Sequence, residues 1–118
     1  MITIYQYPRC STCRRALKWL DDHQVPYQSV NLVEKPPSKA RLKEILARSG
    51  LPVRRLFNTS GQSYREGGFK ERLAQMSEAD ALAALAADGK LIKRPIAIGE
   101  DFALVGFQEE AYRSQFAG

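Results

Sequence analysis

The only two cysteines of the chain, Cys10 and Cys13, are separated by two residues. Residues 2–6 alternate in the manner of a strand and residues 12–23 carry apolar side chains at helical spacing, so the pair falls in a strand-to-helix turn. A thiol at the start of a helix meets unpaired backbone N–H groups and the positive end of the helix dipole. Because both favour the thiolate, which is the nucleophilic form, this segment predicts thiol chemistry.

Three arginines flank the pair, namely Arg9, Arg14 and Arg15, and their charge also favours a thiolate. We expect Cys10 to be the exposed, attacking thiolate. Cys13, in the first helical turn, is expected to resolve the mixed disulfide that this attack forms. The predicted chemistry is therefore thiol–disulfide exchange.

Other uses of the two cysteines stay open on the sequence. A structural disulfide between them closes a loop of about four residues, which loop entropy makes worth only roughly 2 kcal/mol. As a zinc site the pair supplies about half of the usual ligands, and the sole histidine, His23, lies roughly 15 Å further along the predicted helix. Two unreactive thiols are the remaining alternative. No metal site is expected.

The segments that must position the cysteines predict an α/β fold. Residues 27–32 alternate and predict a second strand, so strand, helix and strand form a βαβ unit with a parallel pair. The later elements are expected as follows: a helix capped by Ser38 and ended at Gly50, a short helix over residues 52–57, a helix behind Ser77 that runs to residue 88, an antiparallel hairpin of residues 95–98 and 102–105, and a last helix over residues 109–116. This order is typical of a thioredoxin-like fold with a mixed four-stranded sheet, here with a helical insertion at about residues 38–90.

The pair Arg94-Pro95 is the second candidate for the site. A proline that opens a strand is ordinary, but in thioredoxin-like folds the proline at this position is usually cis and faces the cysteines. We therefore expect a cis Arg94–Pro95 bond, with Pro95 shaping the substrate groove. Arg94 would then point toward Cys10 and bind an anion or help to hold the thiolate. A surface arginine beside a trans proline is the alternative.

Further substrate contacts are expected from Ser11 and Thr12, between the cysteines, and from Asn58. Asn58 opens a run of amide, hydroxyl and glycine residues over positions 58–61. Such a run can present N–H groups to an anion, and it can equally form a tight surface turn. Arg55, on the short helix before it, is interpreted as solvated surface.

Composition and net charge limit the classes of partner that the chain is expected to bind. The chain has 118 residues, 44% of them apolar, and we expect a single domain over residues 1–118. No apolar run approaches the roughly 18 residues of a membrane span, and no signal peptide is visible, so a reducing cytoplasm is the expected location. The net charge of +5 suits an acidic partner or a small anion better than nucleic acid, since no nucleic-acid-binding motif is present. We expect a monomer that contacts neither nucleic acid nor a membrane.

Together these features resemble the arsenate reductase family of thioredoxin-fold proteins, which includes the Spx transcriptional regulators. The resemblance spans nearly the whole chain and is carried by residues 7–14, 35–38, 57–61, 91–96 and 105–107. It implies a redox protein without a bound cofactor. An external thiol system, either thioredoxin or glutathione with glutaredoxin, would return it to the dithiol.

The sequence departs from the arsenate reductases of that family. Those coupled to glutaredoxin use one catalytic cysteine, which matches Cys10, and three arginines around the oxyanion. Arg94 matches one arginine, whereas Asn58 and Gly106 stand near the other two positions. The resemblance therefore implies weak or absent arsenate capture.

The second cysteine, Cys13, is instead the pattern of the Spx-like branch. In that branch the cysteine pair is a redox switch, and the protein binds the C-terminal domain of the RNA polymerase α subunit. The sequence thus predicts a thiol–disulfide redox protein. A redox-sensing regulator that binds RNA polymerase is the first alternative, and a glutaredoxin-coupled arsenate reductase is the second.

Overall fold

Four strands form one sheet in the order β2-β1-β3-β4 in the computed structural model, which describes residues 1–117. They are β1 (Ile2–Gln6), β2 (Tyr27–Asn31), β3 (Ile96–Ile98) and β4 (Ala103–Val105). β1 is parallel to β2 and antiparallel to β3, and β3 is antiparallel to β4. The predicted mixed four-stranded sheet is therefore confirmed.

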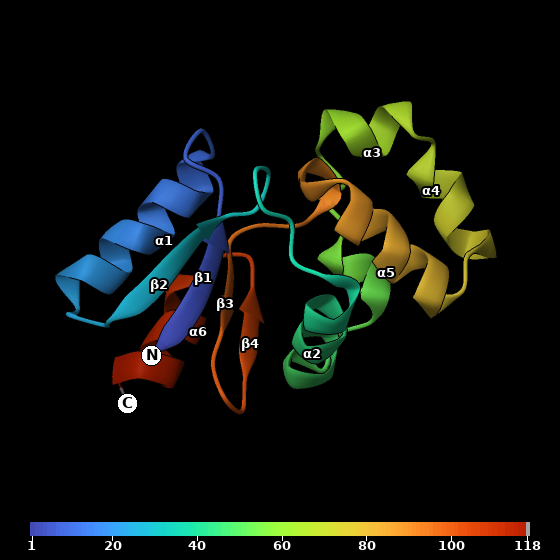
Figure 1. Ribbon diagram of the computed structural model, residues 1–118. Helices are drawn as coiled ribbons and strands as arrows, with labels where there is room; N and C mark the ends of the chain where they lie inside the picture. Colours follow the sequence, from blue (N-terminus) through green and yellow to red (C-terminus); the bar gives the residue numbers. More distant parts are fainter. Residues whose placement is uncertain (118) are drawn as a thin grey trace.

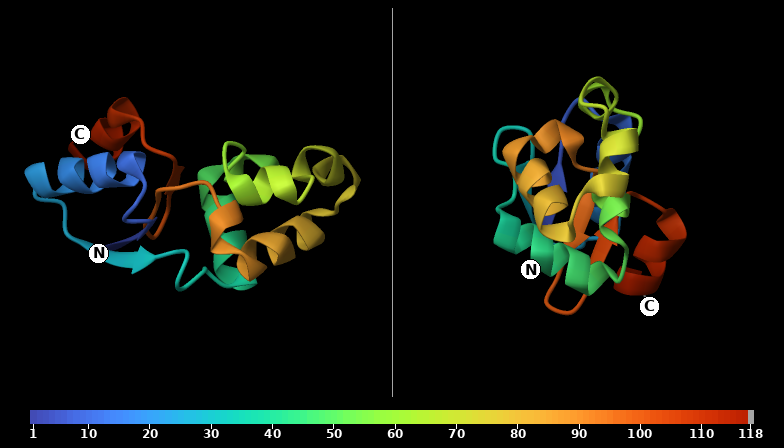
Figure 2. Two further views of the ribbon diagram at one scale, coloured as in Figure 1. Left: turned by 90° about the horizontal axis from the view of Figure 1, so that it is seen from above. Right: turned by 90° about the vertical axis from the view of Figure 1, so that its right-hand side faces the viewer.

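Helices cover both faces of this sheet (Figures 1 and 2). On one face lie α1 (Ser11–Asp22) and the C-terminal helix, which begins as α6 (Glu109–Tyr112) and continues as a π-helical turn over Arg113–Ala117. The helices between β2 and β3 pack on the opposite face. The sheet is thus the middle of three layers, and the turn that carries the cysteines lies at the carboxyl end of β1.

The segment between β2 and β3 is helical, as predicted, but it divides into more pieces than the sequence indicated. The pieces are α2 (Lys39–Ser49), η1 (Val53–Leu56), α3 (Gln62–Glu66), α4 (Phe69–Arg72), η2 (Leu73–Gln75), α5 (Glu78–Ala87) and η3 (Gly89–Leu91). The two predicted N-caps are confirmed, because the Oγ atoms of Ser38 and Ser77 accept the backbone N–H of Arg41 and Asp80, each at 3.1 Å. Gly50 ends α2 with φ +68°, a conformation that glycine adopts without steric cost.

Each face of the sheet has its own core because side chains alternate along a strand. Ile4 is buried on the α1 side, and its neighbour Tyr5 is buried on the side of the insertion. The α1 side is built from Ile2, Ile4, Ala16, Trp19, Leu20, Ala97 and Tyr112. One core holds α1 against the sheet and the other holds the insertion. Together they position α1 and the insertion around the carboxyl end of β1.

The observed ends differ from the predicted ones by one or two residues. α1 begins at Ser11, one residue early, and β3 and β4 each begin one residue late. Such shifts are expected because frayed ends carry weak sequence signals. Within residues 1–117, no helix combines the length and the apolar character needed to cross a membrane.

Candidate functional site

The turn between β1 and α1 holds the two cysteines through backbone hydrogen bonds. The N–H of Cys10 donates to the carbonyl oxygen of Tyr7 at 3.0 Å, and the carbonyl oxygen of Cys10 accepts the N–H of Arg14 at 3.1 Å. Cys10 is itself the N-cap of α1, in an extended conformation. The attacking cysteine predicted from the sequence therefore sits where the first N–H groups of the helix are unpaired.

Each sulfur accepts a backbone hydrogen bond. The Sγ of Cys10 accepts the N–H of Cys13 at 3.4 Å, and the Sγ of Cys13 accepts the N–H of Tyr7 at 3.4 Å. Both thiols are free. Cys10 is half-buried and borders solvent, whereas Cys13 is 0% exposed. Only the first sulfur is open to a partner.

The surroundings of Cys10 favour its thiolate. Burial opposes ionisation, but hydrogen bonds from the backbone and side chain of Cys13 and from the backbone of Thr12, together with the charge of Arg94, hold the pKa of the Cys10 thiol below its ordinary value. The thiolate is the nucleophilic form. Cys10 is therefore better suited to nucleophilic attack than an ordinary thiol.

The surroundings of Cys13 shift the pKa of its thiol in the opposite direction. Burial raises the pKa of the Cys13 thiol to about 12, against the opposing hydrogen bond from the N–H of Tyr7. The neighbouring Cys10 acts in the same direction as burial. Cys13 is thus held as a neutral thiol, whereas Cys10 ionises more readily than an ordinary thiol, so the pair is asymmetric in both access and ionisation.

Arg94 joins the site to the end of the insertion. The Arg94–Pro95 peptide bond is cis, as predicted. One guanidinium nitrogen donates to the carbonyl oxygens of Gly89, Lys90 and Ile92 at 3.3–3.4 Å. The guanidinium carbon lies 5.4 Å from the centroid of the Tyr7 ring, so the positive charge is held beside the cysteine turn.

A cavity of ≈ 660 Å³ lies beside Cys10. Of the residues that the sequence assigned to the site, Cys10, Ser11, Thr12, Asn58 and Arg94 line it, whereas Cys13 and Pro95 are buried and do not. The full lining is Tyr7, Arg9, Cys10, Ser11, Thr12, Arg15, Arg55, Asn58, Ser60, Lys93, Arg94, Val105, Gly106, Phe107 and Gln108. Five of these side chains are cationic and none is a carboxylate, so the cavity is electrostatically suited to an anionic group.

Comparison with known proteins agrees with this architecture. A profile of the ArsC family matches residues 5–115. The chain belongs to the ArsC family. The uncharacterised protein YusI of Bacillus subtilis is 45% identical over 116 residues, which cover 98% of each chain. The global transcriptional regulator Spx of Enterococcus faecalis is 29% identical over 113 residues, which cover 96% of this chain and 84% of Spx.

Solved structures place the chain in the same family. An ArsC-family related protein of Bacteroides fragilis superposes with a TM-score of 0.93 and 42% identity, over 96% of this chain and 95% of that one. A possible arsenate reductase of Streptococcus mutans gives a TM-score of 0.90 and 42% identity, over 98% of both chains. The resemblance inferred from the sequence and the thioredoxin-like fold are both confirmed.

Two cations of this ArsC-family chain line the cavity but were not predicted to do so. Arg55 is exposed, as interpreted, yet it also lines the cavity, and Lys93 was not singled out at all. A Cβ built on Gly106, where φ is +83°, would lie 3.6 Å from Cε of Lys93. Lys93 therefore occupies space beside one position where the family's arginine was expected. The one sequence signal that could have pointed to Lys93 was its position directly before Arg94.

The prediction for the flanking arginines needs correction. Arg9 and Arg15 line the cavity, but Arg14 does not, because its guanidinium donates to the carbonyl oxygen of Pro8 at 2.7 Å. The cation that lowers the pKa of Cys10 is Arg94, from a distant part of the sequence. Local arginines in the sequence were therefore an incomplete guide to the charges that act on the thiol.

Among residues 1–117, no group of three or more His, Cys, Asp or Glu side chains is placed so that it could hold a metal ion. His23 is engaged elsewhere. Its Nδ1 lies 2.8 Å from the carbonyl oxygen of Trp19, and its ring stacks on the Trp19 indole with centroids 3.8 Å apart.

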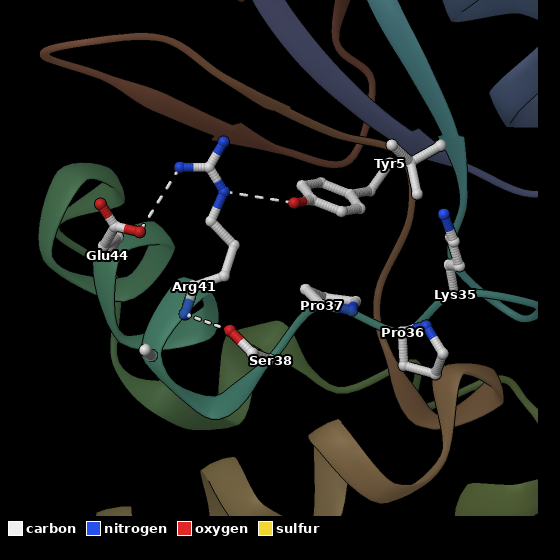
Figure 3. A pocket seen from close by; sticks show the side chains of 9 residues that line it. Tyr5, Lys35, Pro36, Pro37, Ser38, Arg41 and Glu44 are labelled. Carbon is white, nitrogen blue, oxygen red and sulfur yellow. Dashed lines mark hydrogen bonds and ion pairs between the residues drawn. The ribbon is translucent and has the colours of Figure 1, made fainter.

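A second cavity, of ≈ 520 Å³, lies between the end of β2 and the start of α2 (Figure 3). Its polar side chains are largely paired with one another. Arg41 donates to the Tyr5 hydroxyl at 3.2 Å and pairs with Glu44 at 3.4 Å. Neither cysteine lines this cavity.

Proposed function

We propose that the chain is a thiol–disulfide oxidoreductase in which Cys10 attacks and Cys13 resolves. The observation that carries the proposal is the asymmetry of the two thiols. Cys10 borders a cationic cavity and has a lowered pKa, whereas Cys13 is buried and has a raised pKa. An attacker must reach its partner as a thiolate, and a resolving thiol must stay protected until the mixed disulfide forms.

The reaction moves two electrons from the protein to its partner. The Cys10 thiolate attacks one sulfur of a partner disulfide, forms a new S–S bond with it, and expels the other partner sulfur as a thiolate. Cys13 then loses its proton and attacks Cys10 Sγ, which releases the first partner sulfur as a thiolate. The partner disulfide is reduced to two thiols, the protein pair is oxidised to the Cys10–Cys13 disulfide, and the departing thiolates take up the protons.

The residues around Cys10 have assignable roles. Arg94 stabilises the thiolate, because its charge acts on Cys10, and it binds an anionic group of the partner in the cavity that it lines. Ser11, Thr12 and Asn58 line the same cavity and supply polar contacts. Pro95 is buried next to Arg94 and shapes the groove as a fixed backbone element. These are substrate contacts, and no bound cofactor is needed for the electron balance.

The oxidised pair must be returned to the dithiol by an external thiol. A glutathione–glutaredoxin or thioredoxin system supplies the two electrons by the same exchange in reverse. The protein then cycles between the dithiol and the disulfide.

A trapping experiment tests the order of attack. In Cys13→Ser, glutathione disulfide should convert the protein to a stable mixed disulfide on Cys10, because no second thiol can release it. Cys10→Ser is the matched control and should remain unmodified. Trapping in Cys10→Ser, with none in Cys13→Ser, would reverse the assignment, and trapping in neither would refute the proposed oxidoreductase activity.

A redox-sensing regulator is the second candidate. It is favoured by the likeness to relatives named as the global transcriptional regulator Spx, over 96% of this chain. In that case the Cys10–Cys13 disulfide would change affinity for the C-terminal domain of the RNA polymerase α subunit. Binding of that purified domain to the reduced and the oxidised protein separates the candidates, since an oxidoreductase requires no such complex.

A further inference from the structure

An apolar groove lies directly beside the cysteine cavity. It is formed within the insertion by η1, the α3–α4 segment, η2 and the start of α5, and has a volume of ≈ 450 Å³. Its apolar lining includes Val53, Tyr64, Leu73 and Met76, each partly buried against the core. We call this the insertion groove. Its apolar floor is open to solvent and fits the side chains of a bound segment.

Cations border the insertion groove as they do the cysteine cavity. Arg54, Arg55 and Lys70 are exposed and line it, and its lining includes no carboxylate. Within the part of the chain described, none of the ion pairs involves these three side chains. Their charges are thus available to an anionic ligand.

The two hollows adjoin at η1 and the loop that follows it. Arg55 lines both of them. In the loop, Asn58 and Ser60 line the cysteine cavity, and Thr59 between them lines the groove. A ligand that reacts at Cys10 can therefore extend past Arg55 into the groove without leaving a cationic surface.

We propose that the partner of Cys10 is a protein segment in which acidic and apolar residues flank the reacting cysteine, and that the insertion groove binds that flanking segment. This inference rests on the proposed exchange chemistry at Cys10 and names its substrate class. The cavity alone, at ≈ 660 Å³, already suits a drug-sized ligand. The adjoining apolar groove of ≈ 450 Å³ adds room for side chains, and a small oxyanion has no side chains to fill it. Acidic side chains of the segment match Arg54, Arg55 and Lys70, and its apolar side chains cover Leu73 and Met76.

Model peptides test this substrate class. Each is an octapeptide with one cysteine blocked as a 2-pyridyl disulfide, flanked by leucines alternating with either glutamates or lysines. The Cys10 thiolate attacks the peptide sulfur and expels pyridine-2-thione, whose absorbance gives the rate. We expect the acidic peptide to react roughly tenfold or more faster than the basic one at low salt, with the ratio falling at high salt.

Matched variants locate the effect. Lys70→Glu, and independently Arg54→Glu, should lower the acidic-to-basic rate ratio several-fold. Lys43→Glu makes the same charge change at an exposed position of α2 that lines neither hollow, and it should leave the ratio unchanged. Replacing the leucines of the acidic peptide by serines should slow its reaction, because the groove floor is apolar.

Other outcomes would overturn the inference. Equal rates for the two peptides, equal effects of Lys70→Glu and Lys43→Glu, or no effect of the serine replacements would show that the groove takes no part. Glutathione blocked as the same 2-pyridyl disulfide, and therefore with the same leaving group, reacting as fast as the acidic peptide would assign the site to small disulfides. In each of these cases exchange at Cys10 still proceeds, whereas failure of every disulfide to react would refute the proposed function itself.

Discussion

Gly89 lies against the backbone of Leu32, so closely that a Cβ on residue 89 would collide with the Leu32 carbonyl oxygen. This contact joins the point where the chain leaves β2 to the point where it returns from the insertion. Gly89→Ala is therefore expected to lower the free energy of unfolding by about 1–3 kcal/mol, as overpacking does. Urea denaturation measures it.

Gly50→Ala is the control for that change. Gly50 has a left-handed φ of +68°, but nothing lies within 4 Å of a Cβ built on it. An alanine there lowers the free energy of unfolding through the backbone conformation alone, without a steric collision. Both variants should keep the reactivity of Cys10 while folded. Wild-type stability in Gly89→Ala would show that the two backbones separate more easily than their contact implies.

The rate of alkylation should distinguish the two thiols by pH. Deprotonation activates a thiol, so the rate at Cys10 rises with pH through its pKa, and its midpoint should fall below the ordinary value of about 8.5. Cys13 should stay unreactive over the same range, because its pKa is raised to about 12. Iodoacetamide labelling followed by peptide mass spectrometry measures both sites. A first modification at Cys13 would contradict the assignment.

Arg94→Met should move the midpoint for Cys10 upward, because one charge that favours the thiolate is lost. The hydrogen bonds from the backbone remain, so the pKa should not return fully to its ordinary value. Arg14→Met is the matched control, since Arg14 is bonded to the Pro8 carbonyl and should not change the midpoint. Equal shifts in the two variants would remove Arg94 from the site.

Mild peroxide should form a disulfide between Cys10 and Cys13 within one chain. The first turn of α1 brings the N–H of Cys13 to the Sγ of Cys10, so the two sulfurs belong to one compact turn. Intact mass under non-reducing conditions should show a monomer that has lost two hydrogens. A disulfide-linked dimer as the main product would be the contrary result.

Arsenate reduction should be weak or absent. Asn58 and Gly106 replace two expected arginines, and each lost charged hydrogen bond is worth about 1.5–3 kcal/mol, roughly a tenfold effect or more. Asn58→Arg should raise the rate in a glutaredoxin-coupled assay, since residue 58 lines the cavity with Cys10. Wild-type turnover equal to that of a competent arsenate reductase would mean that Arg55 and Lys93 serve in their place.

The sequence was most informative where local signals were strong. The alternation of β1, the CxxC turn and the caps at Ser38 and Ser77 each act over a few residues, so their structures could be predicted. The cis bond at Pro95 followed from the fold that these elements indicated. Short-range signals therefore placed the cysteine pair correctly in the turn between β1 and α1.

The rest depended on contacts between distant segments. Arg55 reaches the cavity from η1, whose Leu56 packs in the core on the insertion side of the sheet, and no local pattern encodes that packing. The direction of Arg14 is set by the carbonyl of Pro8. The pieces α3, α4 and η2 are too short to produce a helical period in the sequence. The charged residues around Cys10 could thus be identified only from the folded structure.

The burial of Cys13 beside Cys10 also bears on oxidative damage. Peroxide converts an accessible thiolate first to a sulfenic acid, and a second equivalent carries it irreversibly to a sulfinic acid. At Cys10 the sulfenic acid meets a neighbouring thiol held within the same turn. Condensation with Cys13 releases water and leaves a disulfide, which thiol–disulfide exchange can reverse. Of the two thiols only that of Cys10 is exposed, and the thiol that protects it from irreversible oxidation lies in the same turn.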